Sequence, residues 1–246
     1  MNSPDPSSPV LEARDLVREF GIFRAVDGIS FNLRSGEFLA VFGPNGAGKT
    51  SLLRLLSGEI LPTSGQVRVL GEALDRGDQS WRLNIGVLSH DSFLYDHLTA
   101  EENLRFYGKL FQLPALGERV QERLEEVGLW KRRDSRVGTF CRGMRQRLAL
   151  ARTLLHDPQV VFLDEPYTGL DAHAASLLND VLGSLKDGAR TVVLVTHNLS
   201  KGLRLADRVA IQVRGRFEFL GGRSEVPSDG FEGFYREVVE RVEELG

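Results

Sequence analysis

The sequence has a single cysteine, Cys141, and no continuous apolar stretch as long as a membrane-spanning helix requires. One cysteine excludes a disulfide within the chain and is consistent with a reducing compartment. Spanning a bilayer takes about 18 or more continuous apolar residues, so we expect any function at a membrane to depend on a partner that spans it. The net charge of −3 excludes a global basic field that would recruit nucleic acid or anionic lipid.

Residues 43–51 read GPNGAGKTS, with glycines at positions 43, 46 and 48. An apolar run, residues 38–42, precedes this stretch, and a segment with helical spacing, residues 52–57, follows it. Glycines let successive backbone N–H groups converge on phosphate oxygens, and the helix adds its N-terminal donors. Lys49 would supply charge to the β- and γ-phosphates, and Thr50 a hydroxyl ligand for Mg²⁺. We therefore predict a nucleotide site formed by Gly43, Pro44, Asn45, Gly46, Ala47, Gly48, Lys49, Thr50 and Ser51.

The order of predicted elements indicates an α/β fold. Short strands within residues 10–42, interrupted by turn residues such as Gly28, favour antiparallel pairing beside the phosphate loop. Residues 160–163 and 191–195 are apolar strands that alternate with helices, which is typical of a parallel nucleotide-binding core. Residues 99–155 between them hold helical segments, and Thr99 with Glu102 predicts a capping box.

These elements predict a P-loop NTPase (RecA-like) core with an antiparallel β subdomain and an inserted α-helical subdomain. We expect residues 1–9 to be disordered and residues 10–220 to form one domain. Within that domain the core comprises residues 10–90 and 158–220, and the helical subdomain residues 91–157. Residues 221–246 would form a C-terminal helical extension.

A second motif, VVFLDEP at residues 160–166, combines an apolar strand with two adjacent carboxylates. At the end of the strand, Asp164 would lie beside the phosphate loop and hold Mg²⁺ directly or through water. Glu165 would orient and deprotonate the attacking water. The alternative is an ordinary strand that ends in an acidic turn. The presence of GPNGAGKTS in the same chain disfavours that alternative.

A third motif, TFCRGMRQR at residues 139–147, opens a helix before the acidic strand, and Gly169-Leu170-Asp171 and Thr196-His197 follow it. In this order the motifs resemble those of the ATP-binding cassette (ABC) ATPases over residues 10–220. The resemblance implies a head-to-tail dimer in which two ATP molecules are sandwiched, each between the phosphate loop of one subunit and the signature of the other. A second helix N-terminus would complete the phosphate cage.

The resemblance also implies the roles of further residues. His197 would be a catalytic residue that contacts the γ-phosphate, and Phe20 the aromatic that stacks on adenine. Cys141, Gly143, Met144 and the D-loop residue Asp171 would contact ATP in trans.

Two regions depart from the family pattern. His90 stands where the family usually has the Q-loop glutamine; a histidine could ligate Mg²⁺, but it reaches differently and titrates near neutrality. In the signature, Cys141 replaces serine, Arg142 glycine and Met144 glutamine. A thiol is a weaker donor than a hydroxyl, and Arg142 would either contact phosphate or point into solvent.

The resemblance implies an ATP-hydrolysing subunit of a membrane transporter, peripheral on the inner, cytoplasmic face of the cell membrane. It would form a homodimer, or a heterodimer with a second ABC ATPase, and dock integral membrane permease subunits on residues 90–127. Residue 90 and the stretch LTAEENLRFY look like the haem-exporter ATPase subunit of cytochrome c maturation. RGMRQR is more similar to ATPases of drug, lipid or polysaccharide exporters.

Two other classes of function are considered. A soluble ABC ATPase acting on DNA or ribosomes would carry long coiled-coil insertions or a second cassette, and the sequence has neither. A P-loop kinase or GTPase would leave TFCRGMRQR unexplained. The basic residues in 131–147 lack an aromatic stacking platform, so we expect no nucleic-acid partner.

Overall fold

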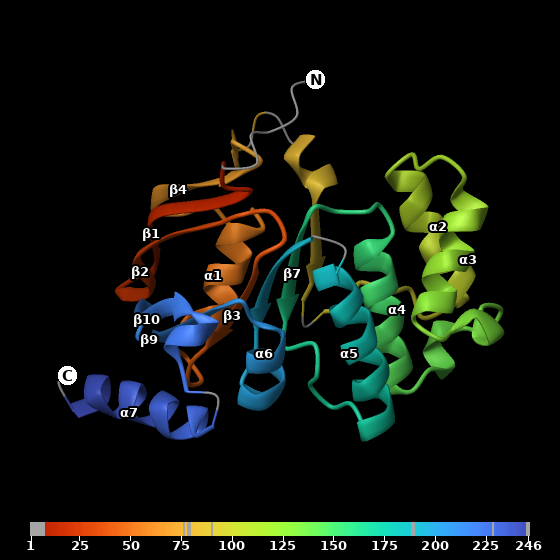
Figure 1. Ribbon diagram of the computed structural model, residues 1–246. Coiled ribbons are helices and arrows are strands. Elements are labelled where there is room, and N and C mark those ends of the chain that lie inside the picture. The colour runs from red at the N-terminus through yellow and green to blue at the C-terminus, as the bar shows by residue number, and fades with distance from the viewer. Residues whose placement is uncertain are drawn as a thin grey trace.

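Two β-sheets and the helices packed on them make up the part of the chain that the structure describes (Figure 1). The computed structural model describes residues 8–75, 77, 80–89, 91–187, 190–227 and 229–244. Residues 1–7 and His90 lie outside these ranges. The disorder predicted for residues 1–9 and the Q-loop role of His90 therefore stay predictions.

The larger sheet has the strand order β10-β9-β3-β8-β7-β6. Its strands are β3 (Phe38–Phe42), β6 (Ile85–Leu88), β7 (Val160–Asp164), β8 (Thr191–Val195), β9 (Arg208–Val213) and β10 (Arg216–Gly222). All neighbours pair in parallel except β10, which is antiparallel to β9. Every residue of β3, β7 and β8 is buried, as expected for parallel strands covered on both faces. Their carboxyl ends meet at one edge, where ligands bind in sheets of this kind.

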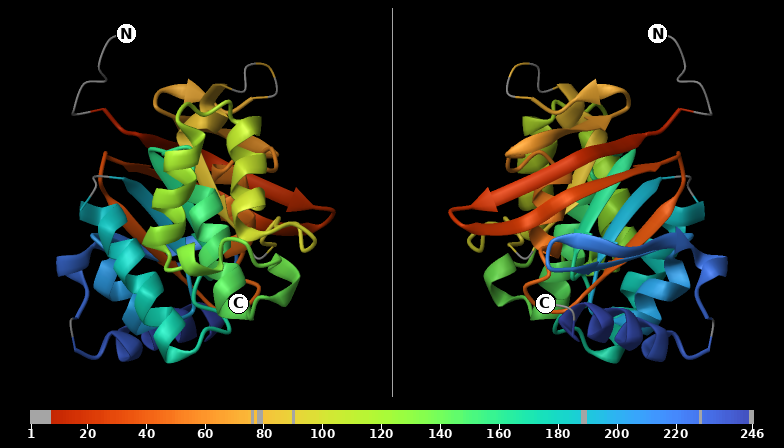
Figure 2. Two further views of the ribbon diagram at one scale, coloured as in Figure 1. Left: turned by 90° about the vertical axis from the view of Figure 1, so that its right-hand side faces the viewer. Right: turned by 90° about the vertical axis from the view of Figure 1, so that its left-hand side faces the viewer.

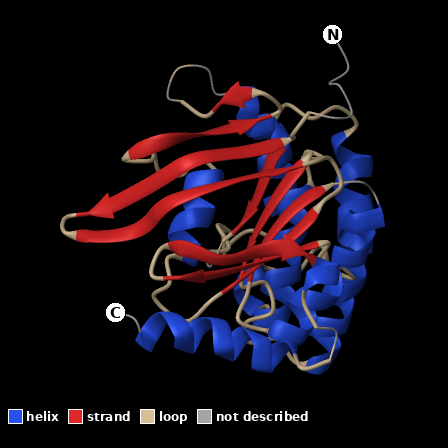
Figure 3. Ribbon diagram, turned by 60° about the vertical axis from the view of Figure 1, so that its left-hand side comes forward, coloured by secondary structure: helices blue, strands red, loops and turns tan. Residues whose placement is uncertain are grey.

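The smaller sheet is antiparallel and has the order β2-β1-β4-β5. Its strands are β1 (Leu11–Phe20), β2 (Phe23–Leu33), β4 (Ser64–Val69) and β5 (Glu72–Ala73). One apolar cluster joins this sheet to α1 (Lys49–Leu56) and to one face of the larger sheet, so α1 lies between the two sheets. Figure 3 shows the strands of the smaller sheet reaching to one side and most helices gathered on the other.

The turn predicted at Gly28 is wrong, because β2 runs through this residue. In the pairing of β1 with β2, Val17 faces Asp27 and Leu16 faces Ile29, so Gly28 is an extra residue between them. Its φ of 71° is the left-handed conformation that glycine adopts without strain. Gly28 therefore forms a β-bulge that bends the strand instead of ending it.

Helices α2 (Ala100–Leu110), α3 (Leu116–Glu126) and α4 (Arg142–Leu154) follow β6 in the chain, as predicted. The capping box is confirmed: Thr99 Oγ1 accepts a hydrogen bond from Glu102 N (3.1 Å), and Glu102 Oε2 accepts one from Thr99 N (2.8 Å). Figures 1 and 2 show α2 and α3 at the end of the molecule away from the smaller sheet.

The remaining helices follow β7. They are α5 (Ala172–Asp187), α6 (Leu199–Leu205) and α7 (Phe231–Glu244). None of the helices in the described ranges combines the length and the apolar character needed to cross a bilayer. The predicted fold class, a P-loop core with an antiparallel β part and inserted helices, is confirmed.

Candidate active site

The phosphate loop, residues 43–48, joins the end of β3 to the start of α1. Gly48 is the N-cap of α1 with a φ of 98°, and a Cβ there would lie 1.9 Å from the Ala25 carbonyl oxygen. Only glycine fits between the loop and β2. Lys49 is 9% exposed, and its Nζ donates to the carbonyl oxygens of Gly43 (2.8 Å) and Pro44 (2.9 Å). Burial lowers the pKa of Lys49, and the nearby carboxylates oppose that shift.

A cavity of about 340 Å³ lies against this loop, a volume in the range of small-molecule sites. The predicted residues that line it are Asn45, Gly46, Ala47, Gly48, Lys49, Thr50, Ser51, Asp164 and Glu165. Pro44 lines a neighbouring cavity with Arg24 and Arg214. Gly43, the first residue of the loop, does not line the cavity and packs on β9, where a Cβ would be 2.1 Å from the Gln212 carbonyl oxygen. The structure thus brings the loop after β3 and the end of β7 to one space.

Asp164 and Glu165 differ in their surroundings. Asp164 is 6% exposed, and burial raises the pKa of its carboxyl, while a hydrogen bond with the Thr50 side chain lowers it. Glu165 has a φ of 48°, and its backbone N–H donates to the Val195 carbonyl oxygen (2.9 Å). A non-glycine residue at positive φ is uncommon and persists where its surroundings hold it.

Two side chains from the end of β8 hold the Glu165 carboxylate. The Thr196 hydroxyl donates to Glu165 Oε2 (3.2 Å), and His197 Nδ1 lies 2.9 Å from the same oxygen. The His197 side chain is 67% exposed, so the rest of its ring faces outward. The structure thus brings the predicted His197 into contact with the predicted base, although His197 does not itself line the cavity.

Phe23 is a cavity residue that the sequence analysis did not name. It lines the cavity together with Ala25, whereas the predicted Phe20 does not. Phe20 pairs with Phe23 across the β1–β2 hairpin and lies under the Arg18 guanidinium, 4.6 Å from the ring centroid. Both rings are solvent-exposed, Phe20 by 48% and Phe23 by 58%. The sequence signal that could have found Phe23 is a second aromatic directly beyond the hairpin turn.

The signature residues begin α4. Cys141 is its exposed N-cap and makes no side-chain cap bond. Arg142 is exposed, as one of the two courses expected from the sequence allows, and its guanidinium lies beside Gly169: a Cβ at Gly169 would be 2.4 Å from Arg142 Cζ. Asp171 Oδ1 accepts a hydrogen bond from Ala174 N (2.7 Å) at the start of α5. None of the residues 141–144, all of them described, lines the cavity of their own chain.

Comparison with known proteins places this architecture in a family. A family model described as "ABC transporter" matches residues 26–168. The chain belongs to the ABC transporter family. A second model, described as "AAA domain, putative AbiEii toxin, Type IV TA system", matches residues 139–200 of this ABC ATPase.

Several curated proteins are similar to the ABC ATPase in sequence. It is 37% identical to Nod factor export ATP-binding protein I of Ralstonia nicotianae over 212 residues, which cover 85% of this chain and 66% of that protein. It is 34% identical to the probable multidrug ABC transporter ATP-binding protein YbhF of Escherichia coli, over 86% of this chain and 37% of that protein. It is 32% identical to the linearmycin resistance ATP-binding protein LnrL of Bacillus subtilis, over 89% of this chain and 71% of that protein. The chain thus spans from about a third to about 70% of the length of these relatives.

Solved structures agree with the fold. A solved ATP binding subunit of an ABC transporter matches with a TM-score of 0.84 and 27% identity, over 93% of this chain and 99% of that chain. A dimeric ATP-binding cassette bound to ADP and Pi matches with a TM-score of 0.78 and 24% identity, over 87% and 98% of the two chains. The second likeness concerns the fold alone.

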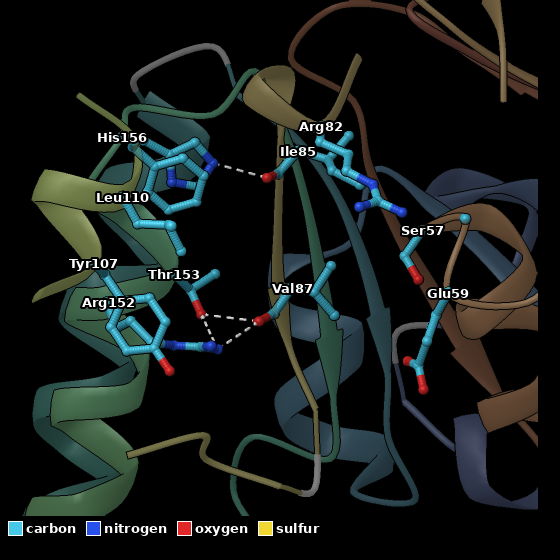
Figure 4. Close-up of a pocket in the computed structure, with 12 residues that line it drawn as sticks. Ser57, Glu59, Arg82, Ile85, Val87, Tyr107, Leu110, Arg152, Thr153 and His156 are labelled. Carbon is cyan, nitrogen blue, oxygen red and sulfur yellow. Dashed lines mark hydrogen bonds between the residues drawn. The ribbon is translucent and has the colours of Figure 1, made fainter. Parts of the chain in front are cut away.

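The ABC ATPase has a second cavity, of about 390 Å³, between β6 and the helices α2 and α4 (Figure 4). Arg152 Nη2 and Thr153 Oγ1 both donate to the Val87 carbonyl oxygen (3.0 Å each). His156 Nε2 lies 2.8 Å from the Ile85 carbonyl oxygen, and its ring stacks on Phe111 with centroids 4.2 Å apart. Burial lowers the pKa of both Arg152 and His156. Figure 4 shows Arg82 and Glu59 on the opposite wall.

The second cavity has an apolar rim. Its large exposed side chains include Leu110, with 67% of its surface exposed. Phe93, Tyr95 and Phe106 are also exposed, and the rings of Tyr95 and Phe106 contact each other with centroids 5.1 Å apart. Apolar surface gathered in one place is typical of an interaction site.

Proposed function

We propose that this ABC ATPase is the ATP-binding and ATP-hydrolysing subunit of an exporter whose membrane-spanning parts are separate chains. The observation that carries the proposal is the meeting of residues 45–51, Asp164 and Glu165 around one cavity, with His197 in contact with Glu165. Export is supported by the names of the curated relatives.

The phosphate loop would bind the β- and γ-phosphates of ATP. Backbone N–H groups at the start of α1 and the positive end of its dipole favour an anion. The Lys49 ammonium uses two donors on loop carbonyls and has a third to offer to phosphate.

Thr50 and Asp164 are the residues that would hold Mg²⁺. Their side chains are already hydrogen-bonded to each other at the edge of the cavity, and hydroxyl and carboxylate oxygens are ligands that Mg²⁺ prefers. The described residues contain no group of three or more His, Cys, Asp or Glu side chains that would bind a metal by itself, which fits a cation bound jointly by protein and phosphate oxygens. When bound, Mg²⁺ would neutralise charge on the β- and γ-phosphates.

Glu165 would take the proton from the attacking water. The hydroxyl of Thr196 and the ring of His197 hold its carboxylate in one orientation. If His197 carries its proton on Nδ1, this proton is donated to Glu165 and Nε2 stays free for the γ-phosphate side of the cavity. Glu165 and His197 would thus act as base and phosphate contact in the same step.

The test is a paired measurement on two variants. Glu165→Gln should lower kcat by a factor of about 10²–10⁴, because the amide keeps the shape but cannot accept a proton. Its affinity for MgATP should stay close to that of the wild type in an equilibrium titration. Lys49→Ala should lose that affinity. Unchanged phosphate release by Glu165→Gln would exclude Glu165 as the base.

The ATP site would be completed by Cys141, Gly143, Met144 and Asp171 of a second ABC ATPase chain, identical or different; none of the four lines the cavity of its own chain. The second cavity and its apolar rim, within residues 91–127 and neighbouring elements, would dock permease subunits and so hold the chain peripherally at the inner face of the membrane. The domain boundaries predicted from the sequence are kept as our proposal.

The names of the relatives bear on the cargo of the proposed exporter. Relatives named for Nod factor export, multidrug transport and linearmycin resistance favour a drug, lipid or polysaccharide exporter. Haem export for cytochrome c maturation is a prediction that these names do not support. Deleting the gene and assaying both drug resistance and cytochrome c content would decide between them. Loss of cytochrome c alone would favour haem.

A further inference from the structure

Gln212 is a fully buried polar residue directly beneath the phosphate loop. It lies on β9 with 0% of its surface exposed. Neither Nε2 nor Oε1 of its side chain has a hydrogen-bond partner among the described residues. Burying a carboxamide without partners is costly, and such groups are rare in native proteins. The buried carboxamide of Gln212 is therefore an exception that a function of the loop above it would explain.

Both ends of the phosphate loop rest on Gln212. A Cβ at Gly43 would lie 2.1 Å from its carbonyl oxygen, and a Cβ at Gly48 would lie 2.9 Å from its Nε2. The turn after β9 supports the loop as well, because Gly215 N donates to the Ala47 carbonyl oxygen (2.9 Å). Gln212 itself has no exposed surface, so it can affect a nucleotide only through the loop.

The hydrogen bonds of Lys49 indicate how nucleotide binding would free an acceptor in the loop for Gln212. Its ammonium donates to the Gly43 and Pro44 carbonyl oxygens, at the end of the loop that rests on Gln212. Contacts with both the β- and the γ-phosphate would take the third donor and one of these two, so that one loop carbonyl would lose its donor. The Gln212 carboxamide, a donor without an acceptor, lies beneath the other end of the same loop, where its Nε2 would be 2.9 Å from a Cβ at Gly48.

We propose that Gln212 is a positioning residue of the phosphate loop, whose carboxamide hydrogen-bonds to the loop backbone when Lys49 turns to phosphate. The proposal rests on the proposed function of the loop in ATP binding. Without nucleotide, the buried Gln212 carboxamide lacks a hydrogen-bond partner, which costs free energy. With nucleotide bound, it would have one. The difference in free energy between the two states adds to MgATP affinity.

The test removes the carboxamide and keeps its volume. Gln212→Met and Gln212→Leu should raise the Kd and KM for MgATP about tenfold, which corresponds to about 1.4 kcal/mol. The kcat at saturating MgATP should change less than twofold, and the Tm without nucleotide should stay equal or rise, because an unpartnered amide is gone. A KM within twofold of the wild type in both variants would overturn the proposal, and so would a lowered Tm with unchanged affinity.

Trp81 provides a matched control. It is 3% exposed, and its indole Nε1 is likewise buried without a partner among the described residues, but it packs against Gly58 beyond the end of α1. Trp81→Phe should alter the Tm and leave the KM for MgATP unchanged. A tenfold higher KM in this variant would attribute the effect to the core in general and overturn the role of Gln212.

A measurement on the wild type covers the case in which the Gln212 variants do not fold. In protein labelled with ¹⁵N-glutamine, the side-chain N–H resonances of Gln212 should move downfield when MgATP saturates the site. No movement overturns the proposal. If the wild type binds MgATP and the Gln212 resonances do not move, only the role of Gln212 is overturned. If the wild type binds no MgATP, the proposed function is overturned too.

Discussion

Two neighbouring phenylalanines at the end of the β1–β2 hairpin differ in what they contact. Phe20 lies under the Arg18 guanidinium, whereas Phe23 lines the cavity at the phosphate loop. A purine base stacks on any exposed aromatic face, and such a contact contributes about 1–3 kcal/mol when a base stacks on a protein ring. At the scale of single residues, the cavity wall therefore favours Phe23 as a contact for the base or ribose of ATP.

Replacing each phenylalanine separately tests this assignment. Phe23→Ala should raise the KM for MgATP by about tenfold, because it removes apolar wall from the cavity. Phe20→Ala should have a smaller effect, since it exposes Arg18 and leaves the cavity lining in place. Steady-state hydrolysis at several ATP concentrations measures both. A larger effect of Phe20→Ala would return the adenine contact to the residue implied by the family resemblance.

The segment that leads into α2 is an element held by one buried side chain. Asn103 is 0% exposed, and its Oδ1 accepts a hydrogen bond from Tyr95 N (2.8 Å). Its Nδ2 donates to the carbonyl oxygens of Tyr95 (3.0 Å) and Thr99 (2.9 Å). Asn103 therefore fixes the chain from Tyr95 to Thr99 on the first turn of α2, beside the apolar rim of the second cavity.

Removing this side chain should cost more stability than removing the helix cap. Asn103→Ala removes three hydrogen bonds of a fully buried side chain and leaves the Tyr95 N–H without its partner, so we expect it to lower the free energy of unfolding by about 2–4 kcal/mol. Thr99→Ala removes the capping hydroxyl and should cost about 1 kcal/mol. Urea unfolding measures both, and Thr99→Ser is the matched control that keeps the hydroxyl. Equal losses for Asn103→Ala and Thr99→Ala would contradict this ranking.

The parts of the site that sequence could predict are those formed by neighbours in the chain. GPNGAGKTS and VVFLDEP each fix a local structure, a glycine turn before a helix and an apolar strand before a carboxylate, so their residues were found together around the cavity. Gln212 was missed because its importance comes from the packing of β9 under a loop far away in the sequence. Gly28 was misread because a glycine at positive φ serves equally in a turn and in a β-bulge, and only the register with β1 distinguishes them.

At the scale of the whole molecule, the signature residues lie outside the cavity formed by the phosphate loop of the same chain. Residues 45–51 line the cavity, whereas Cys141 is exposed at the start of α4. In the proposed head-to-tail dimer, each copy would give a phosphate loop to one site and a signature to the other.

Mixing two inactive variants should restore activity if this arrangement is correct. Lys49→Ala removes a phosphate-loop contact and keeps the signature. Gly143→Asp places a carboxylate where phosphate is expected, at a position where even a Cβ would be 3.0 Å from Ala174. A mixed dimer has one intact site, so the mixture should regain hydrolysis, up to about a quarter of the wild-type rate when half the dimers are mixed. Hydrolysis that stays at the level of the separate variants would contradict a shared site.

The contact of Arg142 with Gly169 acquires a meaning in such a dimer. Arg142 belongs to the segment that we propose would serve the nucleotide of the partner copy, whereas Gly169 comes four residues after Glu165, the proposed base for the chain's own nucleotide. Within one copy the Arg142 guanidinium lies where a side chain on Gly169 would be, so the two segments are in direct contact. We therefore expect the two ATP molecules of one dimer to be hydrolysed with positive cooperativity, each sensing whether the other is still intact.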